Sequence, residues 1–143
     1  MTVEIKSSQS VWLAVVKILN KPVGGFMENI LFIGYQKCST ARKAEKFLLD
    51  NDIPFTKRDI VSDKPTAEEL RRWHEASGLP LRRFFNTSGI LYREGNIKKK
   101  LDEGMTDEAA YQLLASNGLL IKRPIVVADG FVLVGFREDE WRE

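Results

Sequence analysis

Short apolar runs alternate with stretches of helical spacing in the first half of the chain. Residues 30–35 form a brief continuous apolar run, which is typical of a buried strand. The next stretch predicts an amphipathic helix, whose apolar positions share one face at Ala41, Ala44, Phe47 and Leu48. A second strand is predicted over 55–60, and a crossover helix between two strands makes them parallel.

The middle of the chain predicts helices. The sequence Thr-Ala-Glu-Glu at 66–69 has the form of a capping box, and it begins a helix that Gly78 ends. A short helix is predicted over 80–85. A further helix is predicted to start at Thr106 and to be closed by Gly118.

The end of the chain predicts a hairpin. Two apolar runs, 124–128 and 131–135, flank Asp129-Gly130, and an Asp-Gly pair between apolar runs favours a tight turn. A final helix is predicted over 137–142. The order βαβ, helical block, then ββα predicts one α/β domain with a small mixed sheet and helices on its faces.

The N-terminal segment differs from the rest of the chain. Residues 1–26 hold the whole net charge of the chain, and a Gly-Gly pair separates them from the first predicted strand. We expect residues 1–26 to be an extension outside the fold, with Met27 as the natural start and 27–143 as the domain. The alternative is an amphipathic N-terminal helix over about 11–19.

Composition narrows the function classes. The 143 residues carry a net charge of +2, with 43% hydrophobic and 29% charged residues, as in an ordinary globular protein. This balance argues against direct nucleic-acid binding, and no apolar run is long enough to cross a membrane. One cysteine and one histidine argue against a structural metal site. A lone thiol fits the reducing cytoplasm.

Cys38 is the strongest candidate for chemistry. It lies where the first predicted strand passes into a helix, and the free N–H groups and dipole of a helix start favour a thiolate. Lys37 and Arg42 are close in sequence, and the same N–H groups can bind an anion. The alternative is that Cys38 is a small buried hydrophobic residue.

The surrounding motifs resemble the arsenate reductase (ArsC) family, which includes the Spx-type transcription regulators. The resemblance is closest to ArsC-like proteins of Gram-positive bacteria, and it covers essentially all of residues 29–141. The segments that carry it are Tyr-Gln-Lys-Cys-Ser-Thr-Ala-Arg-Lys-Ala at 35–44, Leu-Arg-Arg-Phe-Phe-Asn-Thr-Ser-Gly at 81–89, Leu-Leu-Ile-Lys-Arg-Pro-Ile-Val-Val at 119–127 and Val-Gly-Phe-Arg-Glu at 134–138.

This resemblance implies a thioredoxin-like fold with an enlarged helical insertion, in which Cys38 is the redox cysteine. It also implies that Arg123 supplies positive charge to the thiolate and to an oxyanion, and that Pro124 is cis and positions the thiol partner. The alternative for Arg123 is a surface salt bridge, which contributes little stability.

The sequence departs from the family pattern in two ways. Many relatives have a second cysteine where this chain has Ala41, so Cys38 would be reset by an external thiol such as glutathione, glutaredoxin or thioredoxin. Arsenate reductases of the family hold their oxyanion with three arginines, of which only Arg123 matches cleanly. The others fall on Asn86 and on Phe136, which has Arg137 beside it.

Several other residues have candidate roles. The hydroxyls of Ser39 and Thr40 are expected to cap the helix and could bond the thiolate or an anion. Asn86 and Arg137 are candidates for anion binding, with Arg82 and Arg83 as stand-ins or as a solvated face. His74 is expected to be an ordinary half-buried or surface histidine, and the three lysines at 98–100 a solvated helix face.

The sequence therefore predicts a thiol-dependent oxidoreductase acting on a small oxyanion or thiol substrate, without a bound cofactor. The rival hypothesis is a Spx-like regulator that binds the RNA polymerase alpha subunit. Ala41 removes the two-cysteine switch of that group and counts against a redox-sensing version. Neither the substrate, the reductant nor the oligomeric state follows from the sequence.

Overall fold

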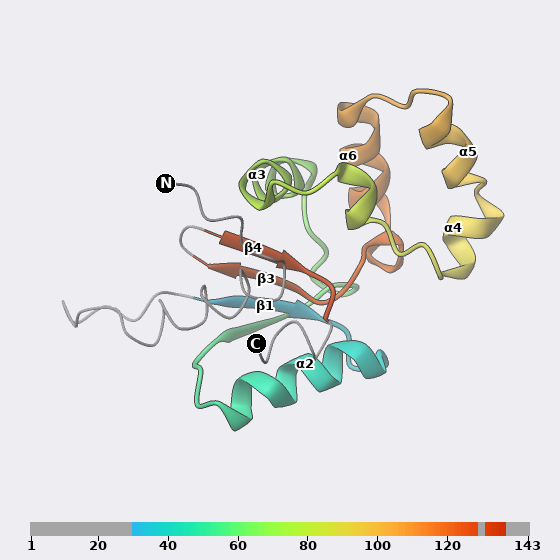
Figure 1. Ribbon diagram of the computed structural model, residues 1–143. Helices are drawn as coiled ribbons and strands as arrows, with labels where there is room; N and C mark the ends of the chain where they lie inside the picture. The colour runs from blue at the N-terminus through green and yellow to red at the C-terminus, as the bar shows by residue number, and fades with distance from the viewer. Residues whose placement is uncertain (1–29, 129–130, 137–143) are drawn as a thin grey trace, which may run out of the picture.

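The computed structural model describes residues 30–128 and 131–136, and its centre is a four-stranded mixed sheet (Figure 1). The strand order is β2-β1-β3-β4. β1 pairs in parallel with β2, as predicted from the helix between them, and antiparallel with β3. β3 and β4 form the predicted antiparallel pair.

The predicted elements within the described residues occur in the predicted order, with somewhat shorter bounds, whereas the short helices over 90–94 and 118–120 were not predicted. The strands are β1 (Leu31–Gly34), β2 (Thr56–Asp59), β3 (Ile125–Ala128) and β4 (Phe131–Val134). The α-helices are α2 (Ser39–Asp50), α3 (Ala67–Ser77), α4 (Ile90–Glu94), α5 (Ile97–Asp102) and α6 (Asp107–Ser116). Two short 3-10 helices complete the described elements, η1 (Leu81–Phe84) and η2 (Gly118–Leu120).

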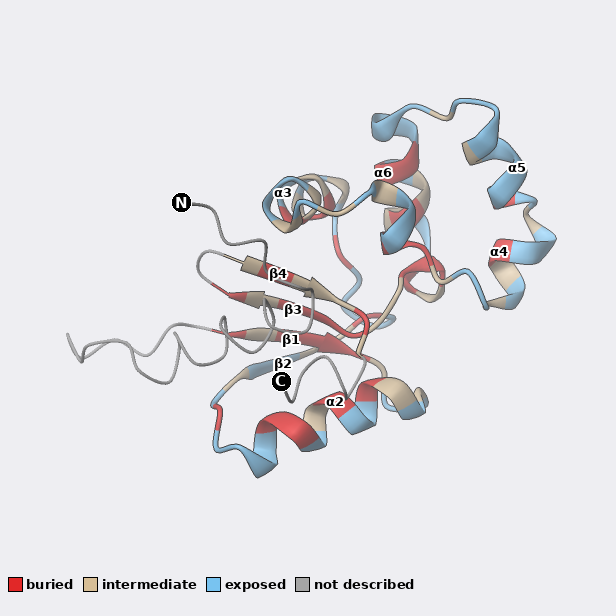
Figure 2. Cartoon of the chain, viewed as in Figure 1, coloured by how far each residue is buried: buried red, intermediate tan, exposed pale blue. Residues whose placement is uncertain are grey.

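Alternation along the strands places an apolar core on each face of the sheet. Phe32 of β1 and Val126 of β3 pack with the buried face of α2, whereas their neighbours Ile33 and Ile125 pack toward α3, α6 and the helical block. The predicted helix face, Ala41, Ala44, Phe47 and Leu48, is buried. Figure 2 shows the buried positions concentrated in the sheet and on the helix sides facing it.

The helical block between β2 and β3 is the enlarged insertion expected from the sequence. α3 has the predicted capping box: Glu69 N donates to Thr66 Oγ1, and Thr66 N donates to Glu69 Oε1. It ends at Gly78, whose backbone is left-handed. α4 and α5 lie beyond α6 on the side away from the sheet (Figure 1).

Gly118 has a different role from the predicted one. α6 ends at Ser116 with Asn117 as its C-cap, so Gly118 does not close the helix but begins η2. A Cβ at position 118 would lie 1.9 Å from the backbone oxygen of Ile60. Only glycine therefore allows the chain after α6 to pass so close to the end of β2.

Some expectations concern residues outside those that the structure describes. These are the extension over 1–26 with Met27, the Asp129-Gly130 turn and the helix over 137–142. Among the described residues, no helix is both long and apolar enough to span a membrane.

Candidate functional site

Cys38 occupies the N-cap position of α2, directly after the loop that follows β1. Its backbone N–H donates to Tyr35 O (N···O 2.9 Å), and its carbonyl accepts the first helical bond from Arg42 N (3.0 Å). The backbone at Cys38 is extended, and the thiol lies beside the first N–H groups of α2. The sulfur is partly exposed rather than sealed in the core, so the interpretation of Cys38 as a buried hydrophobic residue is wrong.

The surroundings of Cys38 favour the thiolate. Partial burial raises the pKa of the thiol, but the Ala41 N–H, the Arg123 guanidinium and the Thr40 N–H together outweigh burial and place the pKa below its ordinary value. The first turn of α2 contains no acidic residue to oppose them. The start of α2 can thus stabilise a nucleophilic sulfur.

Arg123 joins the site from the far end of the insertion. The Arg123–Pro124 peptide bond is cis, as the resemblance implied, and Pro124 is buried. The guanidinium lies over the Tyr35 ring, 5.2 Å from its centroid. Its Nε and Nη1 atoms are buried, and no described group accepts a hydrogen bond from them. Unpaired buried donors are uncommon in folded proteins, and they make Arg123 a candidate for binding an anion.

A pocket of about 410 Å³ opens at Cys38. Thr40 and Arg123 line it beside the thiol, and Asn86 and Leu119 line it from the insertion and η2. The arrangement places a nucleophile, a guanidinium and a neutral amide around one space. It can therefore support attack of the thiolate on a bound electrophile, with a developing negative charge held by Arg123.

Asn86 is held in this wall by local contacts. Its Nδ2 donates to Leu119 O (3.4 Å), and its Oδ1 accepts from Ser88 Oγ (3.3 Å). Gly89 leaves room for the amide, because a Cβ there would lie 2.7 Å from Asn86 Nδ2. Asn86 thus offers hydrogen bonds to the pocket without a charge.

The structure corrects several expectations about the other candidates. Ser39 and Thr40 do not cap α2, because both already have helical backbone and the N-cap is Cys38. Ser39 is exposed and does not line the pocket, whereas Thr40 does. Lys37 and Arg42 are exposed and lie outside the lining, so the charge that reaches the thiol is that of Arg123.

The remaining arginine candidates do not join the pocket in the described part of the chain. Arg82 and Arg83 are exposed, and Arg82 pairs with Asp102 (N···O 2.6 Å), which bears out the solvated-face alternative. Arg137 lies outside the described residues. His74 is half-buried and its Nδ1 lies 2.7 Å from Tyr111 Oη, so it links α3 to α6 away from Cys38.

Sequence reasoning missed the roles of three residues near the thiol. Lys122 and Ile90 line the pocket, and the Arg123 guanidinium lies over the ring of Tyr35. Lys122 precedes Arg123 in the sequence and could have been identified from that proximity. Ile90 gave no signal, because only the fold of the insertion brings the start of α4 to Cys38.

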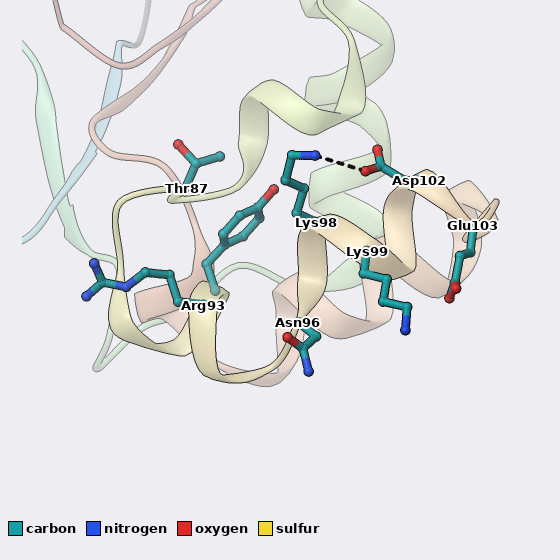
Figure 3. Close-up of a pocket in the computed structure, with 8 residues that line it drawn as sticks. Thr87, Arg93, Asn96, Lys98, Lys99, Asp102 and Glu103 are labelled. Atoms are coloured by element: carbon teal, nitrogen blue, oxygen red, sulfur yellow. Dashed lines mark hydrogen bonds and ion pairs between the residues drawn. The ribbon is translucent and has the colours of Figure 1, made fainter.

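A second hollow lies between α4 and α5 and has a volume of about 520 Å³ (Figure 3). Two of its charged groups pair with each other: Lys98 Nζ donates to Asp102 Oδ2 (3.1 Å). Neither Cys38 nor Arg123 is among the residues that line it. Lys98, Lys99 and Lys100 are exposed, as expected for a solvated face.

Several known proteins are similar to this chain in sequence or in fold. The Bacillus subtilis protein YusI is 44% identical over 115 residues, covering 80% of this chain and 97% of YusI. The crystal structure of an ArsC family related protein from Bacteroides fragilis superposes with a TM-score of 0.76 at 52% identity, covering 80% of this chain and 95% of that one. The global transcriptional regulator Spx of Staphylococcus epidermidis is 29% identical over 73% of this chain and 78% of its own length.

These likenesses confirm the expected thioredoxin-like fold with its mixed sheet and helical insertion. The profile of the ArsC family matches residues 33–143, which includes Cys38, Arg123 and Pro124. The chain therefore belongs to the ArsC family.

Proposed function

We propose that this protein is a thiol-dependent oxidoreductase in which Cys38 is the catalytic nucleophile. The observation that carries the proposal is the position of a partly exposed sulfur at the start of α2, beside the guanidinium of Arg123. Helix N–H groups and a nearby cation both stabilise the thiolate, which is the reactive form of cysteine.

The proposed cycle needs one cysteine and two external thiols. The Cys38 thiolate attacks the electrophilic atom of an oxyanion or one sulfur of a disulfide, and Arg123 stabilises the anion that develops or leaves. An external thiol then attacks the Cys38 adduct, and a second thiol completes the transfer of two electrons. Glutathione, another small thiol, glutaredoxin or thioredoxin could supply them, and no bound cofactor takes part.

The geometry supports individual roles within this proposal. Thr40 contributes its backbone N–H, Asn86 contributes neutral hydrogen bonds to the substrate, and Pro124 fixes the backbone next to Arg123 against the partner. Ser39, exposed at the first turn, has no contact that supports a role in anion binding. Arg137 remains a candidate on the resemblance alone.

Turnover with a thiol donor tests the proposal. The full chain is incubated with arsenate, or with a small disulfide, and with a panel of thiols, beside Cys38→Ser and Arg123→Ala. We expect thiol consumption that Cys38→Ser abolishes and Arg123→Ala slows. Equal rates for the wild type and Cys38→Ser with every substrate would reject the proposal.

The second candidate is a Spx-like role, favoured by the likeness to the Staphylococcus epidermidis regulator. Under this hypothesis the same fold binds the RNA polymerase alpha subunit. Because Ala41 stands where a second cysteine would be needed, such binding would not respond to a disulfide within the loop. Retention of RNA polymerase alpha subunit on the immobilised chain, together with no thiol turnover, would favour this candidate.

A further inference from the structure

The pocket at Cys38 is larger than a tetrahedral oxyanion requires. Its volume of about 410 Å³ falls in the range of roughly 300–1,000 Å³ that suits organic ligands. An oxyanion with a central atom and four oxygens fills only a small part of this space. The excess volume extends from the thiol toward the start of α4, whose first residues line the pocket.

The charge of the pocket is positive and comes from one short segment of the chain. Arg123 and Lys122, adjacent in sequence, are its charged lining residues, and no acidic residue is among the described residues that line it. Asn86, on the wall from the insertion, is neutral. This arrangement suits one carboxylate near the thiol better than a multiply charged oxyanion, which needs cations on several sides.

The lining also includes apolar side chains. They are Ile90, Leu91 and Leu119, and Ile90 is 62% exposed at the first position of α4. An exposed aliphatic side chain in a pocket that also has polar lining gives a surface for the carbon skeleton of a ligand. Leu49, at the other end of α2, is similarly exposed at 59% but does not line this pocket.

From this juxtaposition we propose that the substrate is a small organic disulfide that carries a carboxylate, with Ile90 as a specificity-determining residue. The inference rests on the proposed thiol oxidoreductase activity and names its substrate class. The carboxylate lies against Arg123 and Lys122, and the carbon skeleton lies against Ile90 and Leu119.

The reaction is thiol–disulfide exchange. The Cys38 thiolate forms a bond to one sulfur of the disulfide, the S–S bond breaks, and the second half leaves as a thiolate that takes a proton from solvent. An external thiol then attacks the bound sulfur of the adduct, releases a new mixed disulfide and restores the Cys38 thiolate. A second external thiol reduces that mixed disulfide, so two thiols supply the two electrons.

The experiment compares the rates at which three disulfide probes modify Cys38 of the full chain in the absence of any other thiol. Dithiobis(nitrobenzoate) is aromatic and anionic, dithiodipyridine is aromatic and neutral, and cystamine is aliphatic and cationic. Each rate of Cys38 modification is divided by the intrinsic rate of the probe with a free thiol and by the rate of Cys38 with iodoacetamide. These ratios separate recognition by the pocket from thiolate reactivity.

We expect the normalised rates to fall in the order anionic aromatic, neutral aromatic, cationic. Ile90→Ser should lower the rate with the two aromatic probes by about three- to ten-fold, as for other losses of apolar contact in a pocket. Leu49→Ser is the matched control, since it removes an equally exposed side chain outside the pocket. Lys122→Gln should reduce the preference for the anionic probe over the neutral one.

Two results would overturn the substrate class while leaving the oxidoreductase intact. In the first, iodoacetamide alkylates Cys38 rapidly, but the normalised rates with the three disulfides agree within about twofold and do not change in Ile90→Ser. The pocket then does not discriminate between disulfides. The other is faster thiol-dependent turnover of arsenate than of any disulfide. Slow alkylation of Cys38 near pH 6 would instead remove the proposed function itself, and this inference with it.

Discussion

Arg58 of the edge strand β2 and Glu69 of α3 form a bidentate ion pair. Arg58 Nη1 donates to Glu69 Oε2 (2.8 Å), and Nη2 donates to Oε1 (2.9 Å). The same guanidinium lies 5.9 Å from the centroid of the Trp73 ring. Arg58 thus fastens the start of α3, and with it the helical insertion, to the edge strand of the sheet.

Glu69→Gln is expected to destabilise the fold in a pH-dependent way. The hydrogen bonds from Arg58 lower the pKa of Glu69 to about 2, against roughly 4.3 in an unfolded chain. Because the folded pKa is depressed, the stabilisation is complete above about pH 4.3 and is lost as the pH falls toward 2. The Glu69 side chain is 23% exposed, so solvent screening limits the loss at pH 7 to about 1 kcal/mol.

Urea unfolding of wild type and Glu69→Gln between pH 7 and pH 2 measures this difference. Glutamine keeps the carbonyl that can accept from Thr66 N, so the variant removes the charge and spares the capping box. Glu68→Gln is the control, because Glu68 pairs with Arg71 on the exposed surface and should change stability by less than about 0.5 kcal/mol. A stability gap that stays constant down to pH 2 would contradict the role of the ion pair.

Arg123→Ala is expected to raise the pKa of the Cys38 thiol. The wild-type thiol should alkylate with a pH midpoint below that of a free thiol, about 8.5, because the helix N–H groups and Arg123 outweigh the effect of burial. Iodoacetamide rates over pH 5–9 give the midpoint directly. Arg42→Ala is the control, since Arg42 lies outside the pocket and its loss should not change the pH midpoint. Equal midpoints for Arg123→Ala and wild type would show that Arg123 does not act on the thiol.

Thr40→Val is expected to leave the Cys38 midpoint unchanged. Thr40 lowers the pKa of Cys38 through its backbone N–H, which valine retains. The side-chain hydroxyl has no part in that effect. The same alkylation profile tests this expectation, and a clear rise of the midpoint in the valine variant would show that the hydroxyl bonds the sulfur after all.

Gly89→Ala is expected to act on the pocket through Asn86. The new methyl group would lie 2.7 Å from Asn86 Nδ2, so the amide must leave its place beside Leu119. We expect both Gly89→Ala and Asn86→Ala to slow disulfide attack a few-fold and the double variant to be no slower than either. Additive losses in this double-mutant cycle would mean that the two positions act independently.

Gly118→Ala is expected to be strongly destabilising. Its Cβ would meet the backbone oxygen of Ile60 at 1.9 Å, and backbone yields less readily than a side chain, so the cost should exceed about 3 kcal/mol. Gly78→Ala is the comparison, because its left-handed backbone is strained but nothing lies within 4 Å, which costs about 1 kcal/mol. Thermal unfolding compares the melting temperatures of the two variants. A melting temperature of Gly118→Ala no lower than that of Gly78→Ala would refute the close approach of residue 118 to the Ile60 backbone.

Much of the fold could be predicted because its signals are local. The apolar face of α2, the capping box at Thr66 and the apolar runs of β3 and β4 each follow from patterns within a few residues. Gly118 could not be read in this way. Its need for glycine comes from Ile60, which is far away in sequence, and so the helix-ending interpretation was wrong.

The site was predictable only in part for the same reason. The position of Cys38 at a helix start follows from a strand that leads into a helix, and the resemblance supplied Arg123 and the cis Pro124. The N-cap of α2 was predicted at Ser39 and Thr40 because serine and threonine favour N-caps. In the structure the backbone geometry gives that position to Cys38. Ile90 reaches the pocket through the packing of the insertion, which leaves no local pattern.

The position of the Cys38 sulfur at the start of α2 affects the lifetime of any Cys38 adduct. When the sulfur is bonded to a second sulfur it is no longer anionic, so the N–H groups of Thr40 and Ala41 and the charge of Arg123 lose their acceptor. The thiolate form of the protein is stabilised more than the adduct, and Cys38 becomes a good leaving group. We therefore expect the mixed disulfide to be short-lived in the presence of thiols, so that a single cysteine is enough for repeated turnover.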